Sequence, residues 1–91
     1  MKKRYNIIVS GKVQGVWFRA YTKEKAQELG LTGWVKNNID GTVEIEVEGD
    51  EDKLKEFLNW CWIGSPASKV TDVKYKEKEY TGEFKNFVIR Y

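Results

Sequence analysis

The sequence predicts an α+β fold, an antiparallel sheet with two helices packed on one of its faces. Apolar residues alternate with period two in some stretches and recur at helical spacing in two others. These stretches follow the order β-α-β-β-α-β, with a short extra strand at the end. Strands with one apolar face need a covering layer, and two helices with one apolar stripe each supply it. The predicted architecture is therefore the split β-α-β sandwich called ferredoxin-like.

The first strand and the first helix are joined by a loop that contains glycine. Residues 4–13 alternate as a strand, and residues 18–29 repeat as an amphipathic helix that ends at Gly30. The next stretch, 31–37, is the second strand. The segment from 4 to 37 thus predicts the first β-α-β unit.

A hairpin follows, because the Asp40-Gly41 pair is a strong turn signal. In the third strand, alternate apolar residues are expected to face inward, and a polar row is expected to face solvent. The inward residues are Val43, Ile45 and Val47, and the outward row is Thr42, Glu44, Glu46 and Glu48.

Asp50 is expected to cap a second helix, whose apolar stripe contains Leu54, Phe57, Leu58 and Cys61 and which ends before Gly64. Residues 70–78 alternate as the fourth strand, with Val73 and Tyr75 on its apolar face. After a loop with Gly82, the final strand is expected to point Phe87, Ile89 and Tyr91 in one direction.

Length and composition limit the class of protein. Ninety-one residues, 41% of them hydrophobic, predict one domain over residues 1–91 with a packed core. No apolar run reaches the ~20 residues that a membrane span requires, and the N-terminus lacks the pattern of a signal peptide. The single cysteine, Cys61, fits a reducing compartment, so we expect a cytoplasmic protein that does not bind membranes.

Charge is divided unevenly along the chain. Residues 1–38 carry eight Lys and Arg against two Glu, and residues 39–91 carry eight against twelve acidic residues. The overall charge of +2 is too mild for a dedicated nucleic-acid binder, and the glutamates of the third strand would repel a phosphate backbone. The excess of basic residues in the first segment favours a small anionic ligand there.

The stretch from Gly11 to Arg19 is the candidate anion site. A loop from a strand to a helix N-terminus presents unpaired N–H groups and the positive end of the helix dipole. Arg19 falls in the first helical turn, where a cation is disfavoured unless an anion joins it. The spacing matches neither the dinucleotide fingerprint nor the Walker A loop, so an Arg in solvent at an ordinary strand–helix joint is the simpler alternative.

The available side chains restrict the chemistry. With no histidine and one cysteine, the sequence predicts no zinc or copper site, although a Mg²⁺ site made of carboxylates stays open. An enzyme built from this chain would work by positioning and electrostatic stabilisation. Such a site suits a substrate that is already reactive and strongly anionic, and an acyl phosphate is the obvious example.

Two stretches resemble the signatures of the acylphosphatase family. They are Val-Ser-Gly-Lys-Val-Gln-Gly-Val-Trp-Phe-Arg (9–19) and Gly-Trp-Val-Lys-Asn-Asn-Ile-Asp-Gly-Thr-Val-Glu (33–44). Gly-Ser-Pro (64–66) and the final Phe-Val-Ile-Arg-Tyr (87–91) are also similar to family features, so the resemblance spans nearly the whole chain. It implies hydrolysis of the carboxyl–phosphate bond of acyl phosphates to carboxylate and inorganic phosphate, without a metal or another cofactor.

The resemblance also implies roles for individual residues. It assigns phosphate binding to Arg19 and to the backbone of Gln14, Gly15, Val16, Trp17 and Phe18, and it assigns the attacking water to Asn37. Arginine offers a planar pair of donors to phosphate, and an asparagine can orient a water without removing its proton. Inorganic phosphate, the product, is expected to compete with the substrate.

Two alternatives stay open. Without the resemblance, Asn37 reads as a turn residue before Asp40-Gly41. A regulatory module of the same fold could bind a small anion through the same loop and Arg19 without turning it over, and only an assay of turnover separates the two.

Overall fold

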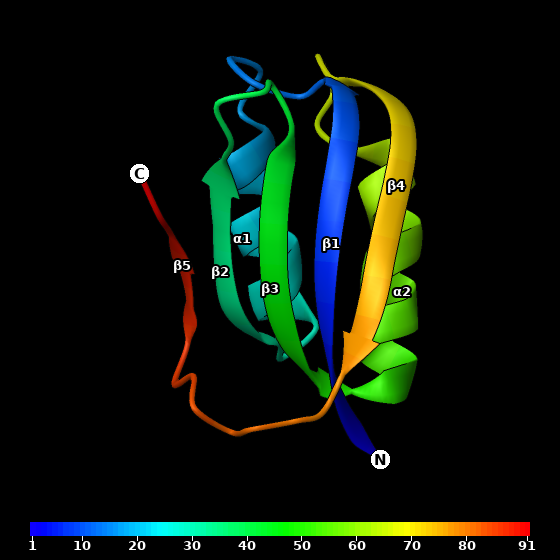
Figure 1. Ribbon diagram of the computed structural model, residues 1–91, viewed down its shortest axis with the longest axis vertical. Coiled ribbons are helices and arrows are strands. Elements are labelled where there is room, and N and C mark those ends of the chain that lie inside the picture. The colour runs from blue at the N-terminus through cyan, green and yellow to red at the C-terminus, as the bar shows by residue number, and fades with distance from the viewer.

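The computed structural model describes all 91 residues, 1–91, as one sheet with two helices on one face (Figure 1). In chain order the elements are β1 (Lys2–Lys12), α1 (Phe18–Glu28), β2 (Thr32–Asn37), β3 (Val43–Asp50), α2 (Glu51–Ile63), β4 (Lys69–Lys78) and β5 (Phe87–Ile89). The predicted order of helices and strands is confirmed, and the predicted ends differ from these by one or two residues.

The strands lie in the order β4-β1-β3-β2-β5. The four long strands pair antiparallel, as expected, but β5 pairs with β2 in parallel, which makes the sheet mixed. The reason is the route of the chain. After β4, the segment 79–86, here called the strap, crosses beneath the ends of the sheet before it enters β5 (Figure 1). It therefore enters β5 at the end of the sheet where β2 begins.

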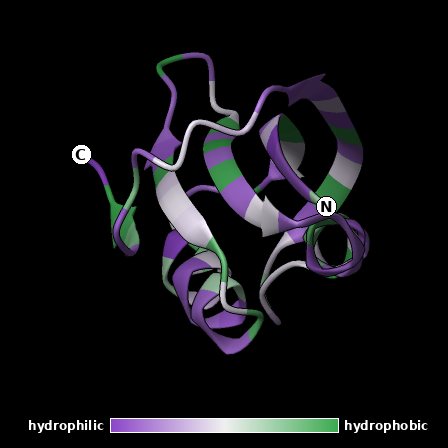
Figure 2. Cartoon of the chain, turned by 90° about the horizontal axis from the view of Figure 1, so that it is seen from below, coloured by the Kyte–Doolittle hydropathy of each residue, from purple (hydrophilic) through white to green (hydrophobic).

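The core lies between the sheet and the helices. Ile7, Ile45 and Val35 from neighbouring strands are fully buried, and they belong to one core cluster with Leu54 and Phe57 of α2. Each helix buries one stripe and shows polar residues outward, so that the outer surfaces of both helices are largely hydrophilic (Figure 2). Area burial of this kind is the main stabilising term in a small domain. Neither helix combines the length and the hydrophobicity that crossing a bilayer would require.

The expectation that the glutamates of β3 face solvent is wrong for Glu46 and Glu48. Glu46 is 3% exposed and Glu48 is 1% exposed, although both lie on the sheet face opposite the helices. Glu46 accepts hydrogen bonds from Arg4, Asn6 and Lys78. Burying a carboxylate costs free energy, and the hydrogen bonds from two cationic side chains and one amide offset this cost for Glu46.

Glu48 attaches the strap to the sheet. One carboxylate oxygen accepts from the Thr81 hydroxyl at 2.7 Å and the Thr81 amide at 2.9 Å, and the other accepts from the Gly82 amide at 3.0 Å. Arg4 adds a bridge to Glu83 in the same segment. The strap thus covers Glu48, and side chains of β1 and β4 surround Glu46, which the alternation of β3 could not reveal.

Candidate active site

The loop between β1 and α1 has an unusual backbone. Gly15 has φ 72° and Trp17 has φ 63°, so both lie in the left-handed region. The region is ordinary for glycine but costs a residue with a side chain of order 1–3 kcal/mol, and such strain gathers at functional sites. Trp17 occupies the N-cap position of α1, where no side chain caps the helix, and its carbonyl accepts from the Tyr21 amide. The first turn of α1 therefore begins with uncapped N–H groups.

Arg19 lies in that first turn and is partly buried. No acidic residue accompanies it there, so the positive end of the helix dipole and the guanidinium reinforce one another. Its guanidinium carbon lies 4.8 Å from the centre of the Tyr91 ring, a cation–π contact. No ion pair with a carboxylate engages it. The planar donors of Arg19 are thus available to an anion.

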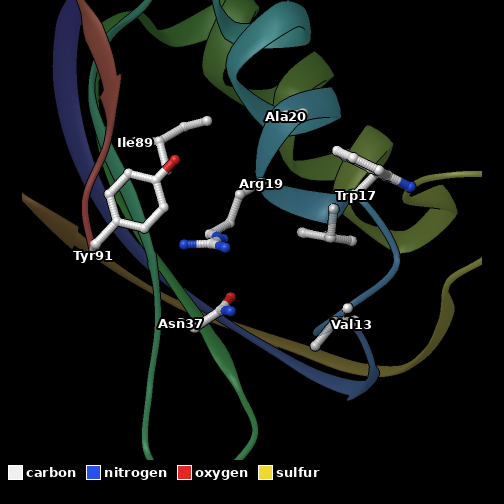
Figure 3. A pocket seen from close by; sticks show the side chains of 9 residues that line it. Val13, Trp17, Arg19, Ala20, Asn37, Ile89 and Tyr91 are labelled. Atoms are coloured by element: carbon white, nitrogen blue, oxygen red, sulfur yellow. The ribbon is translucent and has the colours of Figure 1, made fainter.

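Asn37 is the last residue of β2 and points toward Arg19 (Figure 3). Its Oδ1 atom is buried and has no hydrogen-bond partner, and it is the single buried side-chain N or O atom of which this is true. A buried acceptor without a donor costs about 1–3 kcal/mol. An orphaned oxygen at this place indicates a missing donor, such as a water molecule.

Arg19 and Asn37 share one pocket of about 330 Å³. Tyr91 and Ile89 form one side of it and Trp17 and Val13 the other (Figure 3). Gly15, Phe18 and Ala20 complete the lining. No acidic side chain lines the pocket, so the side chains give it one cation and one neutral amide, beside the helix N-terminus.

The residues predicted for the site divide into two groups. Gly15, Trp17, Phe18, Arg19 and Asn37 line the pocket, so chain segments far apart in the sequence meet there. Two others of the predicted loop, Gln14 and Val16, do not line it. The Gln14 side chain bonds instead to the β2–β3 turn.

Four pocket residues were not predicted as site residues. They are Val13, Ala20, Ile89 and Tyr91. Val13 directly precedes the predicted phosphate-binding residues 14–19 and Ala20 directly follows them, so the same local sequence could have included both. The alternation of Phe87, Ile89 and Tyr91 also placed the last two on one face. The sequence did not reveal that β5 pairs in parallel with β2, which places this face beside the pocket.

Two side chains hold the loop in place. The side-chain amide of Gln14 donates to the backbone carbonyls of Asn38 at 2.8 Å and Thr42 at 2.9 Å. The Ser65 hydroxyl, in the loop after α2, donates to the Val16 carbonyl at 2.7 Å, and Ser65 is 2% exposed. The loop is therefore fastened on two sides by neighbours distant in sequence.

Comparisons with known proteins identify the family of this chain. The family model described as Acylphosphatase matches residues 5–89. An acylphosphatase of Bacillus licheniformis is 52% identical, over 97% of this chain and 98% of its own. One of Pelotomaculum thermopropionicum is 47% identical, over 99% and 98%. The crystal structure of acylphosphatase from Bacillus subtilis matches with a TM-score of 0.95 and 45% identity over the full length of both chains. In sequence and in fold, this chain belongs to the acylphosphatase family.

Proposed function

We propose that this protein hydrolyses the carboxyl–phosphate bond of a small acyl phosphate, with Arg19 and the backbone of residues 14–18 holding the phosphate and Asn37 orienting the attacking water. Its class, a hydrolase that acts on acyl phosphates, follows from membership of the family. The orphaned Oδ1 of Asn37, buried beside Arg19 in one pocket, is the strongest support for this assignment.

Phosphate binding is supported by four features of the loop and of the first turn of α1. The first turn of α1 presents N–H groups without intrahelical partners. The dipole of α1 adds a partial positive charge, and Arg19 adds a full one with two parallel donors. The left-handed angles of Gly15 and Trp17 give the loop the kind of backbone that gathers at functional sites. Together these groups match a doubly charged anion.

The water role is supported by Asn37. Its free carbonyl oxygen can accept a hydrogen bond from water, but an amide cannot take the proton away. With no histidine in the chain and no acidic side chain in the pocket, the side chains that line it offer no ordinary general base. In the proposed reaction one water is added across the bond, the carboxylate leaves, and the proton of the water passes to a phosphate oxygen of the substrate.

The remaining parts of the proposal follow from the same residues. The reaction needs no metal or other cofactor, because the charge is supplied by Arg19 and the helix N-terminus. Inorganic phosphate is both product and competitive inhibitor. We further propose that residues 1–91 act as a single domain in the cytoplasm, on a small molecule and not on nucleic acid or a membrane.

The test is turnover of benzoyl phosphate by the purified protein, with and without EDTA. We expect benzoate and inorganic phosphate to be released at the same rate in both. Binding of inorganic phosphate without release of benzoate would favour the regulatory module instead. A loss of turnover in EDTA that Mg²⁺ restores would refute the metal-free mechanism.

A further inference from the structure

We propose that Gln14 is a positioning residue for the reaction, one that sets the distance between the phosphate loop and Asn37. This inference rests on the proposed function. It concerns the side chain of Gln14, whereas the phosphate cradle concerns only the backbone of the loop.

The two halves of the site lie on segments that are separate in the sequence. Arg19 and the N–H groups follow the loop 13–17, whereas Asn37 lies at the end of β2, immediately before the turn 38–42. A water on Asn37 reacts only if it is close to a phosphate held by the loop. Misplacement by ~1 Å can cost about a hundredfold in rate. The contact between loop and turn therefore matters for catalysis.

Gln14 makes that contact. Its Nε2 donates both hydrogens, one to the Asn38 carbonyl at 2.8 Å and one to the Thr42 carbonyl at 2.9 Å. No other hydrogen bond joins residues 13–17 to residues 38–42. The Asn38 carbonyl belongs to the residue directly after Asn37. A shift of the loop would thus be transmitted to Asn37 through Gln14.

The turn itself is rigid enough to receive this constraint. The Asn38 amide donates to the Thr42 carbonyl at 2.8 Å, and the Thr42 amide donates to the Asp40 carboxylate at 3.0 Å. These bonds hold the turn closed without Gln14. Gln14 is thus needed for the placement of the turn against the loop, not for its formation.

The experiment replaces Gln14 with Met, which keeps the length and removes both donors. We expect Gln14→Met to lower kcat for benzoyl phosphate about tenfold, while the inhibition constant of inorganic phosphate changes less than about threefold. Ser65→Ala is the matched control, since it removes the other anchor of the loop without touching the turn. It should weaken phosphate inhibition more than Gln14→Met does.

A double-mutant cycle separates positioning from general stability. If Gln14 acts through Asn37, adding Gln14→Met to Asn37→Ala should change the residual kcat less than about twofold. Additive losses, or equal losses in kcat and in phosphate inhibition, would overturn the proposal. Gln14→Asn, a polar side chain one methylene too short to reach both carbonyls, should repeat the result and replaces Gln14→Met if the latter does not fold.

Amide hydrogen exchange gives a readout that does not depend on turnover. Gln14→Met should speed exchange in both 13–17 and 38–42, whereas unchanged exchange in either segment would overturn the coupling. An absence of benzoyl phosphate hydrolysis by the unaltered protein would instead count against the proposed function. The two failures are therefore distinguishable.

Discussion

The Ser65 hydroxyl donates a hydrogen bond to the Val16 carbonyl at 2.7 Å, and both residues are buried. This bond joins the loop after α2 to the loop between β1 and α1, two segments that lie far apart in the chain. The backbone of the β1–α1 loop is thereby held by a side chain that does not line the pocket.

Removing this hydroxyl should therefore affect both stability and phosphate binding. In Ser65→Ala the buried carbonyl of Val16 loses its donor, which costs about 1–3 kcal/mol in the free energy of unfolding. The loosened loop should also bind inorganic phosphate more weakly. Urea unfolding and inhibition by phosphate measure the two effects, and a variant with unchanged phosphate inhibition would contradict the anchoring role.

Arg19→Ala should abolish turnover and phosphate binding together, because the main charge that holds the phosphate is gone. A hydrogen bond to a charged group contributes about 1.5–3 kcal/mol, and positioning amplifies the loss. Arg19→Lys should rescue poorly, because an ammonium cannot reproduce two parallel donors. Steady-state kinetics with benzoyl phosphate provide the check, and substantial activity in Arg19→Ala would refute the assignment.

Asn37→Ala should destroy kcat and leave the affinity for inorganic phosphate within a few-fold, because Asn37 is assigned to the water and not to the phosphate. Removal of its orphaned Oδ1 should not destabilise the fold, and thermal unfolding supplies that control. Equal losses of inhibitor binding and turnover would show that its role is assigned wrongly.

Glu46 should make the stability depend on pH in the acid range. Burial alone would raise the pKa of Glu46, but hydrogen bonds from Asn6, Arg4 and Lys78 outweigh it and hold the pKa below the ordinary 4.5. A lowered pKa stabilises the folded state fully above the unfolded value, and the benefit is lost as the pH falls through the folded value. The free energy of unfolding should thus fall below about pH 4.5, and less steeply in Glu46→Gln. Denaturant titrations at pH 7 and pH 3.5 measure the free energy of unfolding of the two proteins. An equal loss of this free energy between the two pH values would exclude Glu46 as the cause.

Cys61 should matter for stability and not for rate. The thiol is fully buried among apolar residues, and burial raises its pKa, so the reactive thiolate does not form at neutral pH. Cys61→Ala should lower the melting temperature and leave kcat for benzoyl phosphate unchanged. A thiol-blocking reagent should likewise leave the folded enzyme active, and loss of activity under native conditions would contradict this expectation.

The periodicity of apolar residues predicted most of the fold because it marks the face of each strand or helix that packs against the core. The alternation of Val43, Ile45 and Val47 placed one face of β3 in the core correctly. It could not show that Glu46 and Glu48 on the other face are buried as well, because Glu48 is covered by the strap, a segment without periodicity, and Glu46 by side chains of β1 and β4. Position in the strand determines the direction of a side chain, not what lies above it.

The residues of the candidate site also differ in how far the local sequence could predict them. The loop with Gly15 and Arg19 was recognisable from local sequence, because the chain itself places these residues at a helix N-terminus. Asn37 needed the family resemblance, since a strand end before a turn has an ordinary structural reading. Its proximity to Arg19 depends on tertiary packing, as do the contacts of Gln14 and Tyr91.

The edges of the sheet also bear on how the protein behaves in concentrated solution. One edge is β4, ten residues long, and its partner on the inside is β1. Long unpaired edges invite another chain to add as a strand and so begin aggregation. Lys74 and Lys76 stand exposed along β4, and a second copy pairing there would bring the two sets of ammonium groups together. The other edge, β5, offers only three residues to an incoming strand. The same lysines that contribute nothing to the pocket therefore help to keep copies of the protein apart.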